Sequence, residues 1–209
     1  MTMRIAVAIS GRGSNLEALL HALDATAPAQ IALVLSDREA AGLALARERK
    51  IPAEMLSIAT DARAWLSLLE RYRIDLVVLA GYLKLVPREV IAAYRGRILN
   101  IHPALLPAFG GQGMYGRRVH EAVLASGVHE TGATVHLVDE AYDHGATLAQ
   151  ARVPVLPGDT PELLAQRVLE VEHQLLPAVV LAAARAGRPV VLDSRLPTRD
   201  HPAHQGRAH

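Results

Sequence analysis

The stretch Arg4-Ile-Ala-Val-Ala-Ile-Ser-Gly-Arg-Gly-Ser-Asn-Leu16 decides the fold of this chain. Its apolar first half predicts a strand over 4–9, and its two glycines predict a turn. Leucines follow at positions 16, 19, 20 and 23, and these spacings of three and four are typical of one face of a helix. The sequence therefore predicts a strand, a glycine turn and a helix in direct succession.

The same alternation of strands and helices continues along the chain. The segment Asp75-Leu-Val-Val-Leu-Ala80 is apolar at consecutive positions, as expected of a strand buried on both faces of a parallel sheet. We therefore predict an α/β fold, a single-domain, mostly parallel Rossmann-like sheet with helices on both faces. The remaining strands are expected at 31–35, 97–102, 134–138 and 148–153, and the helices at 40–49, 61–72, 87–94, 119–125 and from 161 onward.

Three segments are expected to depart from regular structure. The glycine-rich segment 107–118 should be a mobile surface loop. Pro177 should bend the last helix or end it early, because proline lacks the N–H group that a helix hydrogen bond needs. We predict that residues 1–195 form the domain and that 196–209, which have no apolar pattern, are a disordered tail.

The composition excludes several classes of protein. The 209 residues include 22 basic and 21 acidic side chains, so the broad positive field of a nucleic-acid-binding protein is not expected. Without cysteine there is neither a disulfide nor a thiolate nucleophile. No segment reaches the ~18 uninterrupted apolar residues of a membrane span. We expect a cytoplasmic monomer or homodimer with small-molecule substrates, no nucleic-acid partner and no membrane partner.

The glycine turn is a candidate anion site. A glycine-rich turn that opens onto a helix presents unpaired backbone N–H groups and a favourable dipole to an anion. Leu16 stands where the dinucleotide fingerprint needs a third glycine, and no Walker lysine follows. A structural alternative stays open, because Ser14-Asn-Leu-Glu17 matches a capping box in which Ser14 caps the helix. Capping and phosphate binding do not exclude each other.

Asn100 and His102 form a candidate catalytic pair. They lie two apart at the carboxyl end of a predicted strand, so they project to the same side. Transfer of an acyl group to an amine needs donors for the developing oxyanion and a group that titrates near neutrality, and an amide and an imidazole supply both. Asp143 is the candidate carboxylate that would orient the ring and favour its cationic form. The alternatives are a structural histidine and an ordinary Asx turn.

Two other histidines are candidate metal ligands or site residues. His120-Glu121 is not followed by a second histidine at zinc-protease spacing, so no metal is expected. His136 alternates with Val135 on a predicted strand, and it either borders the site or is a hydrogen-bonded core histidine.

Five motifs resemble those of the glycinamide ribonucleotide formyltransferase family in residues and order. They are Ser10-Gly-x-Gly-Ser-Asn-Leu16, Leu79-Ala-Gly-Tyr-Leu-Lys84, Leu99-Asn-Ile-His-Pro-Ala-Leu-Leu-Pro107, Gly132-x-Thr-Val-His-Leu-Val138 and Asp143-x-Gly145. The resemblance spans about 4–192. It implies an enzyme of de novo purine biosynthesis that transfers the formyl group of 10-formyltetrahydrofolate, its cosubstrate, to the amine of 5'-phosphoribosylglycinamide by direct attack, without a metal.

The resemblance also implies a role for each matching residue. His102 would be the proton donor, Asn100 would lie on the formyl oxygen, and Asp143 would complete the catalytic set. Glu172 would hold the ribose or glycinamide portion of the acceptor, although the helical pattern alone favours an exposed surface carboxylate. The implied phosphate-binding residues are Gly13, Ser14 and Asn15, and the implied folate-binding residues are Arg63, Leu83, Lys84, Leu85, Val86, Asn100, Asp139, Glu140, Ala141, Tyr142 and Asp143.

Two departures and three other functions bear on this assignment. Lys84 stands where arginine is common in the family, so a forked contact would become a point charge. The loop 110–116 is longer than in many members and resembles a bacterial variant. Formyltetrahydrofolate deformylase shares the amide, imidazole and carboxylate but carries an additional amino-terminal domain. A non-catalytic nucleotide-binding module is a further alternative. Methionyl-tRNA formyltransferase needs a further domain and positive charge for RNA.

Overall fold

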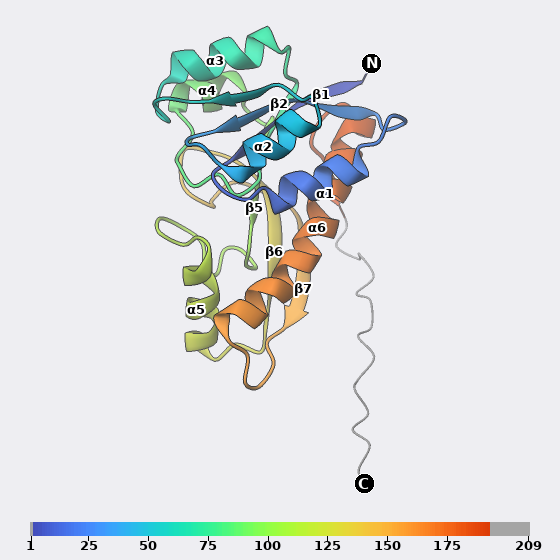
Figure 1. Cartoon of the computed structure of the whole chain (residues 1–209). Helices are drawn as coiled ribbons and strands as arrows, with labels where there is room; N and C mark the ends of the chain where they lie inside the picture. Colours follow the sequence, from blue (N-terminus) through green and yellow to red (C-terminus); the bar gives the residue numbers. More distant parts are fainter. Residues whose placement is uncertain (1, 193–209) are drawn as a thin grey trace.

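The computed structural model describes residues 2–192, which build one seven-stranded sheet with helices on both faces (Figure 1). The strand order is β3-β2-β1-β4-β5-β6-β7. All pairings from β3 to β5 are parallel, whereas β5–β6 and β6–β7 are antiparallel, so the predicted mostly parallel α/β fold is confirmed. The strands are β1 (Met3–Ile9), β2 (Ala29–Ser36), β3 (Ala53–Met55), β4 (Leu76–Leu79), β5 (Ile98–His102), β6 (Glu130–Leu137) and β7 (Thr147–Pro154), and the helices are α1 (Ser14–Ala22), α2 (Ala41–Glu48), α3 (Ala62–Arg71), α4 (Arg88–Ala93), α5 (Arg117–Ser126) and α6 (Pro161–Ala186).

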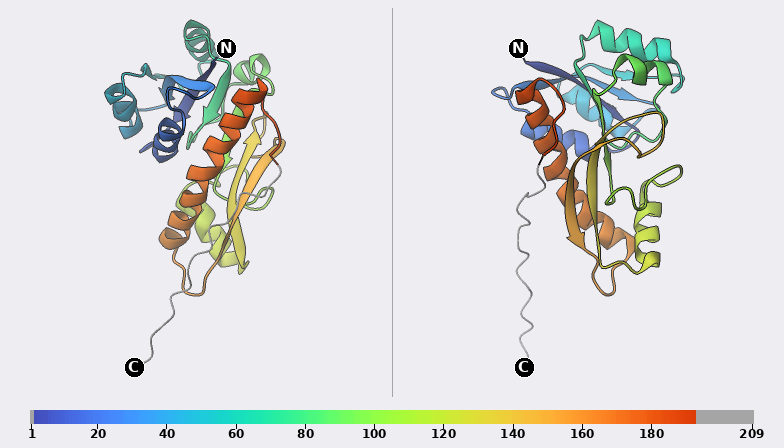
Figure 2. Two further views of the ribbon diagram at one scale, coloured as in Figure 1. Left: turned by 90° about the vertical axis from the view of Figure 1, so that its right-hand side faces the viewer. Right: turned by 180° about the vertical axis from the view of Figure 1, so that it is seen from behind.

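Successive residues of β1 pack against opposite layers of helices. Ile5, Val7 and Ile9 join an apolar cluster with residues of α1, α2 and α6, whereas Ala6 and Ala8 join a second cluster with residues of α3 and α4. Because all five side chains are fully buried, β1 lies between two cores. Figure 2 shows α6, the longest helix, lying along β6 and β7, against which it packs.

β6 pairs antiparallel with β5, the strand that carries the candidate catalytic residues Asn100 and His102. In the register of β5 and β6, Asn100 lies opposite His136 and His102 lies opposite Thr134. The side chains of directly opposed residues share one face of the sheet. His136 is therefore placed beside Asn100 by backbone pairing.

Two local predictions are wrong, and each has a physical reason. Of the two outcomes expected at Pro177, the early end is wrong, because α6 continues to Ala186. Pro177 is itself buried among apolar neighbours of the same helix, and this packing offsets the missing hydrogen bond. Ser14 does not cap α1, because Gly13 occupies the N-cap position in the left-handed conformation, with φ 84°, and makes no side-chain cap. That tight turn, which suits glycine, places Ser14 inside the first helical turn.

The remaining boundaries differ little from the prediction. α5 begins at Arg117, so the loop before it is shorter than expected, and β6 begins four residues earlier than predicted, at Glu130. The predicted tail, 196–209, lies outside the described residues. Between residues 2 and 192, no helix combines the length and the apolar character needed to cross a membrane.

Candidate active site

A cavity of about 770 Å³ lies at the carboxyl ends of β1, β4 and β5, where open α/β sheets bind their ligands. Its walls come from the glycine turn after β1, the segment after β4, the loop before α5 and the first half of α6. The lining residues include Arg12, Ser14, Asn15, Leu83, Lys84, Leu85, Val86, Asn100, His102, His120, His136, Ala141, Tyr142, Asp143 and Glu172.

The glycine turn presents the amino end of α1 to the cavity. Gly42 N donates a hydrogen bond to Gly11 O at 3.2 Å, which ties the turn to α2. A Cβ on Gly13 would meet Gly42 Cα at 3.0 Å, so close packing as well as positive φ requires glycine at position 13. Ser14 and Asn15 form part of the wall, whereas Gly13 shapes the turn without lining the cavity. A helix start in this position is suited to an anion.

Asn15 and Glu172 meet in the wall although 157 positions separate them in the sequence. Asn15 Nδ2 donates to Glu172 Oε2 at 2.6 Å, and Glu172 is only 7% exposed. The prediction of an exposed carboxylate at position 172, which the helical pattern favours, is therefore wrong. Burial raises the pKa of Glu172 to about 7, and the Asn15 hydrogen bond, which favours the ionised form, opposes that change.

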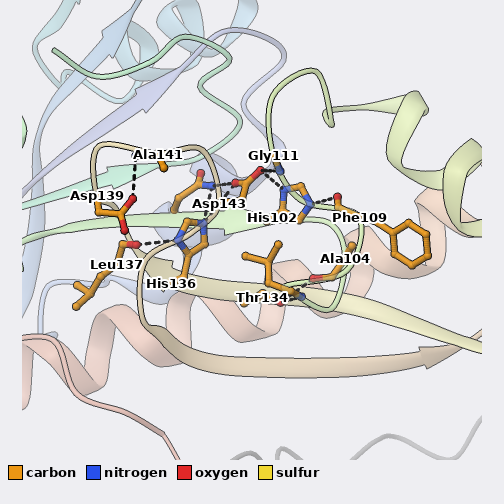
Figure 3. A network of polar contacts seen from close by, with 12 residues as sticks. His102, Ala104, Phe109, Gly111, Thr134, His136, Leu137, Asp139, Ala141 and Asp143 are labelled. Atoms are coloured by element: carbon orange, nitrogen blue, oxygen red, sulfur yellow. Dashed lines mark hydrogen bonds and ion pairs between the residues drawn. The ribbon is translucent and has the colours of Figure 1, made fainter. Parts of the chain in front are cut away.

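Asp143 lies between two histidines (Figure 3). Its Oδ2 is 3.4 Å from His102 Nδ1 and accepts a hydrogen bond from Gly111 N at 3.0 Å. Its Oδ1 is 3.5 Å from His136 Nε2 and accepts a hydrogen bond from Asn100 Nδ2 at 3.3 Å. The structure thus brings Asn100, His102 and Asp143 together, as the sequence predicted.

The hydrogen bonds of His136 decide how Asn100 is oriented. His136 Nδ1 is 2.8 Å from Leu137 O, and since a carbonyl only accepts, Nδ1 carries the hydrogen. In the neutral ring, Nε2 then accepts from Asn100 Nδ2 at 3.0 Å. The second amide hydrogen of Asn100 points to Asp143, so both Nδ2 hydrogens of Asn100 are used in hydrogen bonds within the protein. Asn100 must rotate, or exchange one of these bonds, before it can donate to a ligand. His136 is both a buried core histidine and a residue of the cavity wall.

His102 is held between two acceptors. Its Nε2 donates to Phe109 O at 2.8 Å, and its Nδ1 faces Asp143. Two flanking acceptors favour the doubly protonated ring, as predicted for Asp143, but burial has the larger effect and lowers the pKa of His102. Burial by itself would raise the pKa of Asp143. The hydrogen bonds to this carboxyl group and the neighbouring imidazoles have the larger combined effect, so its pKa is lowered. The pair therefore combines an ionised carboxylate with an imidazole that loses its proton readily.

The second half of the cavity carries most of the predicted folate-binding residues. Residues 83–86 line it after β4, and 141–142 line it beside Asp143. Asp139 and Glu140 are not part of the lining, because Asp139 caps the backbone of its own turn and Glu140 forms an ion pair with Arg88. Arg63 is exposed on α3 and lies outside the cavity wall.

Sequence reasoning assigned no ligand-binding role to Arg12 or His120, and both line the cavity. Arg12, at the tip of the glycine turn, is exposed and adds a positive charge beside Ser14. His120 is buried on α5 and lines the cavity as well. Its position between the buried Val119 and Val123 is typical of a helix core, so the pattern carried no functional signal. Within residues 2–192, no group of three or more His, Cys, Asp or Glu side chains could hold a metal ion.

Comparisons with known proteins agree with this geometry. The formyl transferase family model matches residues 3–180. The chain is 47% identical to a chloroplastic phosphoribosylglycinamide formyltransferase of Vigna unguiculata, over 86% of this chain and 60% of that protein. It is 42% identical to a phosphoribosylglycinamide formyltransferase of Mycobacterium tuberculosis, over 90% of this chain and 88% of that protein. The chain thus spans about 60% of the plant relative but nearly all of the bacterial one.

Solved structures show the same likeness. The crystal structure of glycinamide ribonucleotide transformylase 1 from Symbiobacterium toebii has a TM-score of 0.82 and 40% identity, over 92% of this chain and 95% of that one. A formyltetrahydrofolate deformylase from Pseudomonas syringae has a TM-score of 0.79 but only 25% identity, over 92% of this chain and 67% of that one. The chain is therefore more similar in sequence to the transformylase than to the deformylase, although both folds match it almost equally well.

Proposed function

The chain belongs to the formyl transferase family, and on this premise we propose that it is a phosphoribosylglycinamide formyltransferase of de novo purine biosynthesis. The reaction moves the formyl group of 10-formyltetrahydrofolate to the amine of 5'-phosphoribosylglycinamide. One observation carries the proposal: Asn100, His102 and Asp143 converge in the same cavity as the glycine turn of α1.

The acceptor occupies the end of the cavity formed by α1 and α6. Its phosphate binds at the start of α1, where Ser14 and Asn15 line the wall and Arg12 adds a positive charge. Glu172 accepts hydrogen bonds from the ribosyl portion. The supporting feature is the Asn15–Glu172 contact, which joins the two recognition groups into one surface.

The amine of the acceptor attacks the formyl carbon next to His102. The carbonyl oxygen becomes anionic as the new C–N bond forms, and donors aimed at that oxygen stabilise the tetrahedral centre. His102 acts in its protonated form, and Asp143 keeps that form accessible by opposing the effect of burial. The tetrahedral centre collapses as the bond from the formyl carbon to the folate nitrogen breaks, and that nitrogen leaves with a proton from His102. The proton released by the attacking amine restores the protonated imidazole. Asn100 contributes its amide once it turns from the contact to His136 or Asp143.

The formyl donor occupies the half of the cavity lined by 83–86 and 141–142. The side chains of Leu83, Leu85 and Tyr142 are partly exposed there and offer an apolar surface to a pterin ring. Lys84 is the cation of this wall and suits a carboxylate of the donor. The cytoplasmic location and the monomeric or dimeric state remain predictions from the sequence.

The test is a formyl-transfer assay with the purified chain, 10-formyltetrahydrofolate and 5'-phosphoribosylglycinamide. We expect formylated product, and little formate when the acceptor is omitted, which distinguishes the transferase from a deformylase. His102→Asn should lower kcat by about 10²-fold or more, with the affinity for the donor within about threefold of the unaltered chain. Absence of product with both substrates present would refute the proposal, and an inactive chain that binds nucleotide would indicate a binding module.

A further inference from the structure

His120 has a buried imidazole to which the proposed reaction assigns no role. It is 5% exposed, and its Nδ1 is buried without a hydrogen-bond partner among residues 2–192. Val119 and Val123 complete the buried face of α5, where an apolar side chain at position 120 would pack without leaving a polar atom unpaired. A polar group retained in such a place calls for a partner that the folded chain itself does not supply.

The position of His120 indicates which part of a ligand it faces. α5 packs against α6, and Figure 1 shows it beside the first turns of α6, far from α3 and α4. Gln166 and Glu172 of α6 line the same cavity as His120, and the proposed function places the acceptor beside Glu172. His102 lines this cavity as well, and its charge when protonated lowers the pKa of His120. It therefore lies on the acceptor side, next to the reacting centre.

The charge state of His120 indicates which chemical group of a ligand it can bind. Burial lowers the pKa of His120, and the neighbouring His102 lowers it further. Among residues 2–192, no carboxylate opposes these two effects. The ring is then neutral, with one donor and one acceptor nitrogen. A phosphate dianion is better matched by Arg12 and the start of α1. A neutral amide is the better match for His120.

We propose that His120 binds the glycinamide portion of the acceptor by a hydrogen bond and so holds the attacking amine beside His102. This inference rests on the proposed function, because it names a residue that recognises the same acceptor. It adds a contact from α5 to those made by the glycine turn and α6.

His120→Leu tests the proposal, because leucine has a similar volume and cannot form the hydrogen bond. The KM for 5'-phosphoribosylglycinamide should rise about tenfold, while the KM for 10-formyltetrahydrofolate stays unchanged. The melting temperature should rise by about 2–4 °C, because an unpaired buried nitrogen is removed. His120→Asn and His120→Gln place an amide near the position of Nδ1 or Nε2, and one of them should restore part of the acceptor affinity.

His173→Leu is the matched control. His173 also has a buried ring nitrogen without a partner, but it lies outside the cavity wall. This variant should gain stability without a change in either KM. An unchanged acceptor KM in His120→Leu, or an equal rise in both KM values, would overturn the inference while the unaltered chain remained active. No turnover by the unaltered chain would instead refute the proposed function, and the inference would fall with it.

Discussion

Replacing Glu172 with glutamine should stabilise the protein above pH 7 and weaken its binding of the acceptor. Glu172 is 7% exposed and receives one hydrogen bond, from Asn15 Nδ2 at 2.6 Å. No cation pairs with it among residues 2–192, so its charge is compensated by a single amide. Glutamine keeps an oxygen acceptor for Asn15 and removes the charge.

The expected magnitude follows from the pKa of Glu172, which burial raises from 4.5 to about 7. Because the folded-state pKa lies above the unfolded value, the stabilisation by the neutral acid is complete below pH 4.5 and is lost as the pH rises through 7. At about 1.4 kcal/mol per pH unit between the two values, the ionised carboxylate destabilises the fold by on the order of 3 kcal/mol at pH 9. Glu172→Gln should recover most of this free energy there, and less than about 1 kcal/mol at pH 5.

Thermal melts from pH 5 to pH 9 would measure the effect. For a chain of this size, 3 kcal/mol corresponds to a rise in melting temperature of roughly 6–12 °C. Glu170→Gln, at an exposed position of the same helix, is the control and should show no gap that grows with pH. In the transfer assay, Glu172→Gln should raise the acceptor KM by about tenfold, because a hydrogen bond to a charged group is lost. Equal melting temperatures of Glu172→Gln and the unaltered chain at pH 9 would refute the reasoning.

Two further substitutions test the catalytic pair and the glycine turn. Asp143→Asn removes the charge that raises the pKa of His102. The kcat should fall by about 10²-fold or more, and the alkaline limb of the pH profile of kcat should move to lower pH. A move of that limb to higher pH would contradict the assigned roles. Gly13→Ala places a Cβ at 3.0 Å from Gly42 Cα at φ 84°, so urea unfolding should show a loss of about 1–2 kcal/mol together with a higher acceptor KM. Gly11→Ala, whose Cβ would meet no atom within 4 Å, should leave stability unchanged, and similar losses for both variants would reject the steric explanation.

The parts of the fold that depend on local pattern could be predicted from the sequence. Consecutive apolar residues in β1 and β4, and spacings of three and four in α1, follow directly from burial on two faces or on one. The burial of Glu172 could not be predicted in this way, because a carboxylate on an amphipathic helix has the same pattern whether it faces solvent or a cavity. Its environment depends on Asn15, 157 positions away.

In the candidate site, too, features set by local pattern could be predicted, whereas most contacts between segments distant in the sequence could not. Strand alternation was enough to predict that Asn100 and His102 share a face. Asp143 was predicted as their carboxylate partner, but the contacts with His136 and Phe109 could not be predicted, because they depend on the register of β6 and on the backbone of a loop. His136 reaches Asn100 through the β5–β6 pairing, and the acceptor for His102 Nε2 is the carbonyl of Phe109, which no side-chain pattern reveals.

The cavity also concentrates features that do not favour stability. Phe109 and Asp143 adopt positive φ angles of 57° and 55°, and such strain costs on the order of 1–3 kcal/mol at each residue. Both contact His102, so the strained backbone holds the Phe109 carbonyl and the Asp143 carboxylate beside the imidazole. Asn15 Oδ1 and His120 Nδ1 are buried in the same wall without partners among residues 2–192. If substrates complete these contacts, substitutions that relieve the unpaired atoms should stabilise the empty protein and weaken its acceptor binding. Stability and acceptor affinity should therefore change in opposite directions at the wall formed by α1, α5 and α6, and in the same direction in the core of β1.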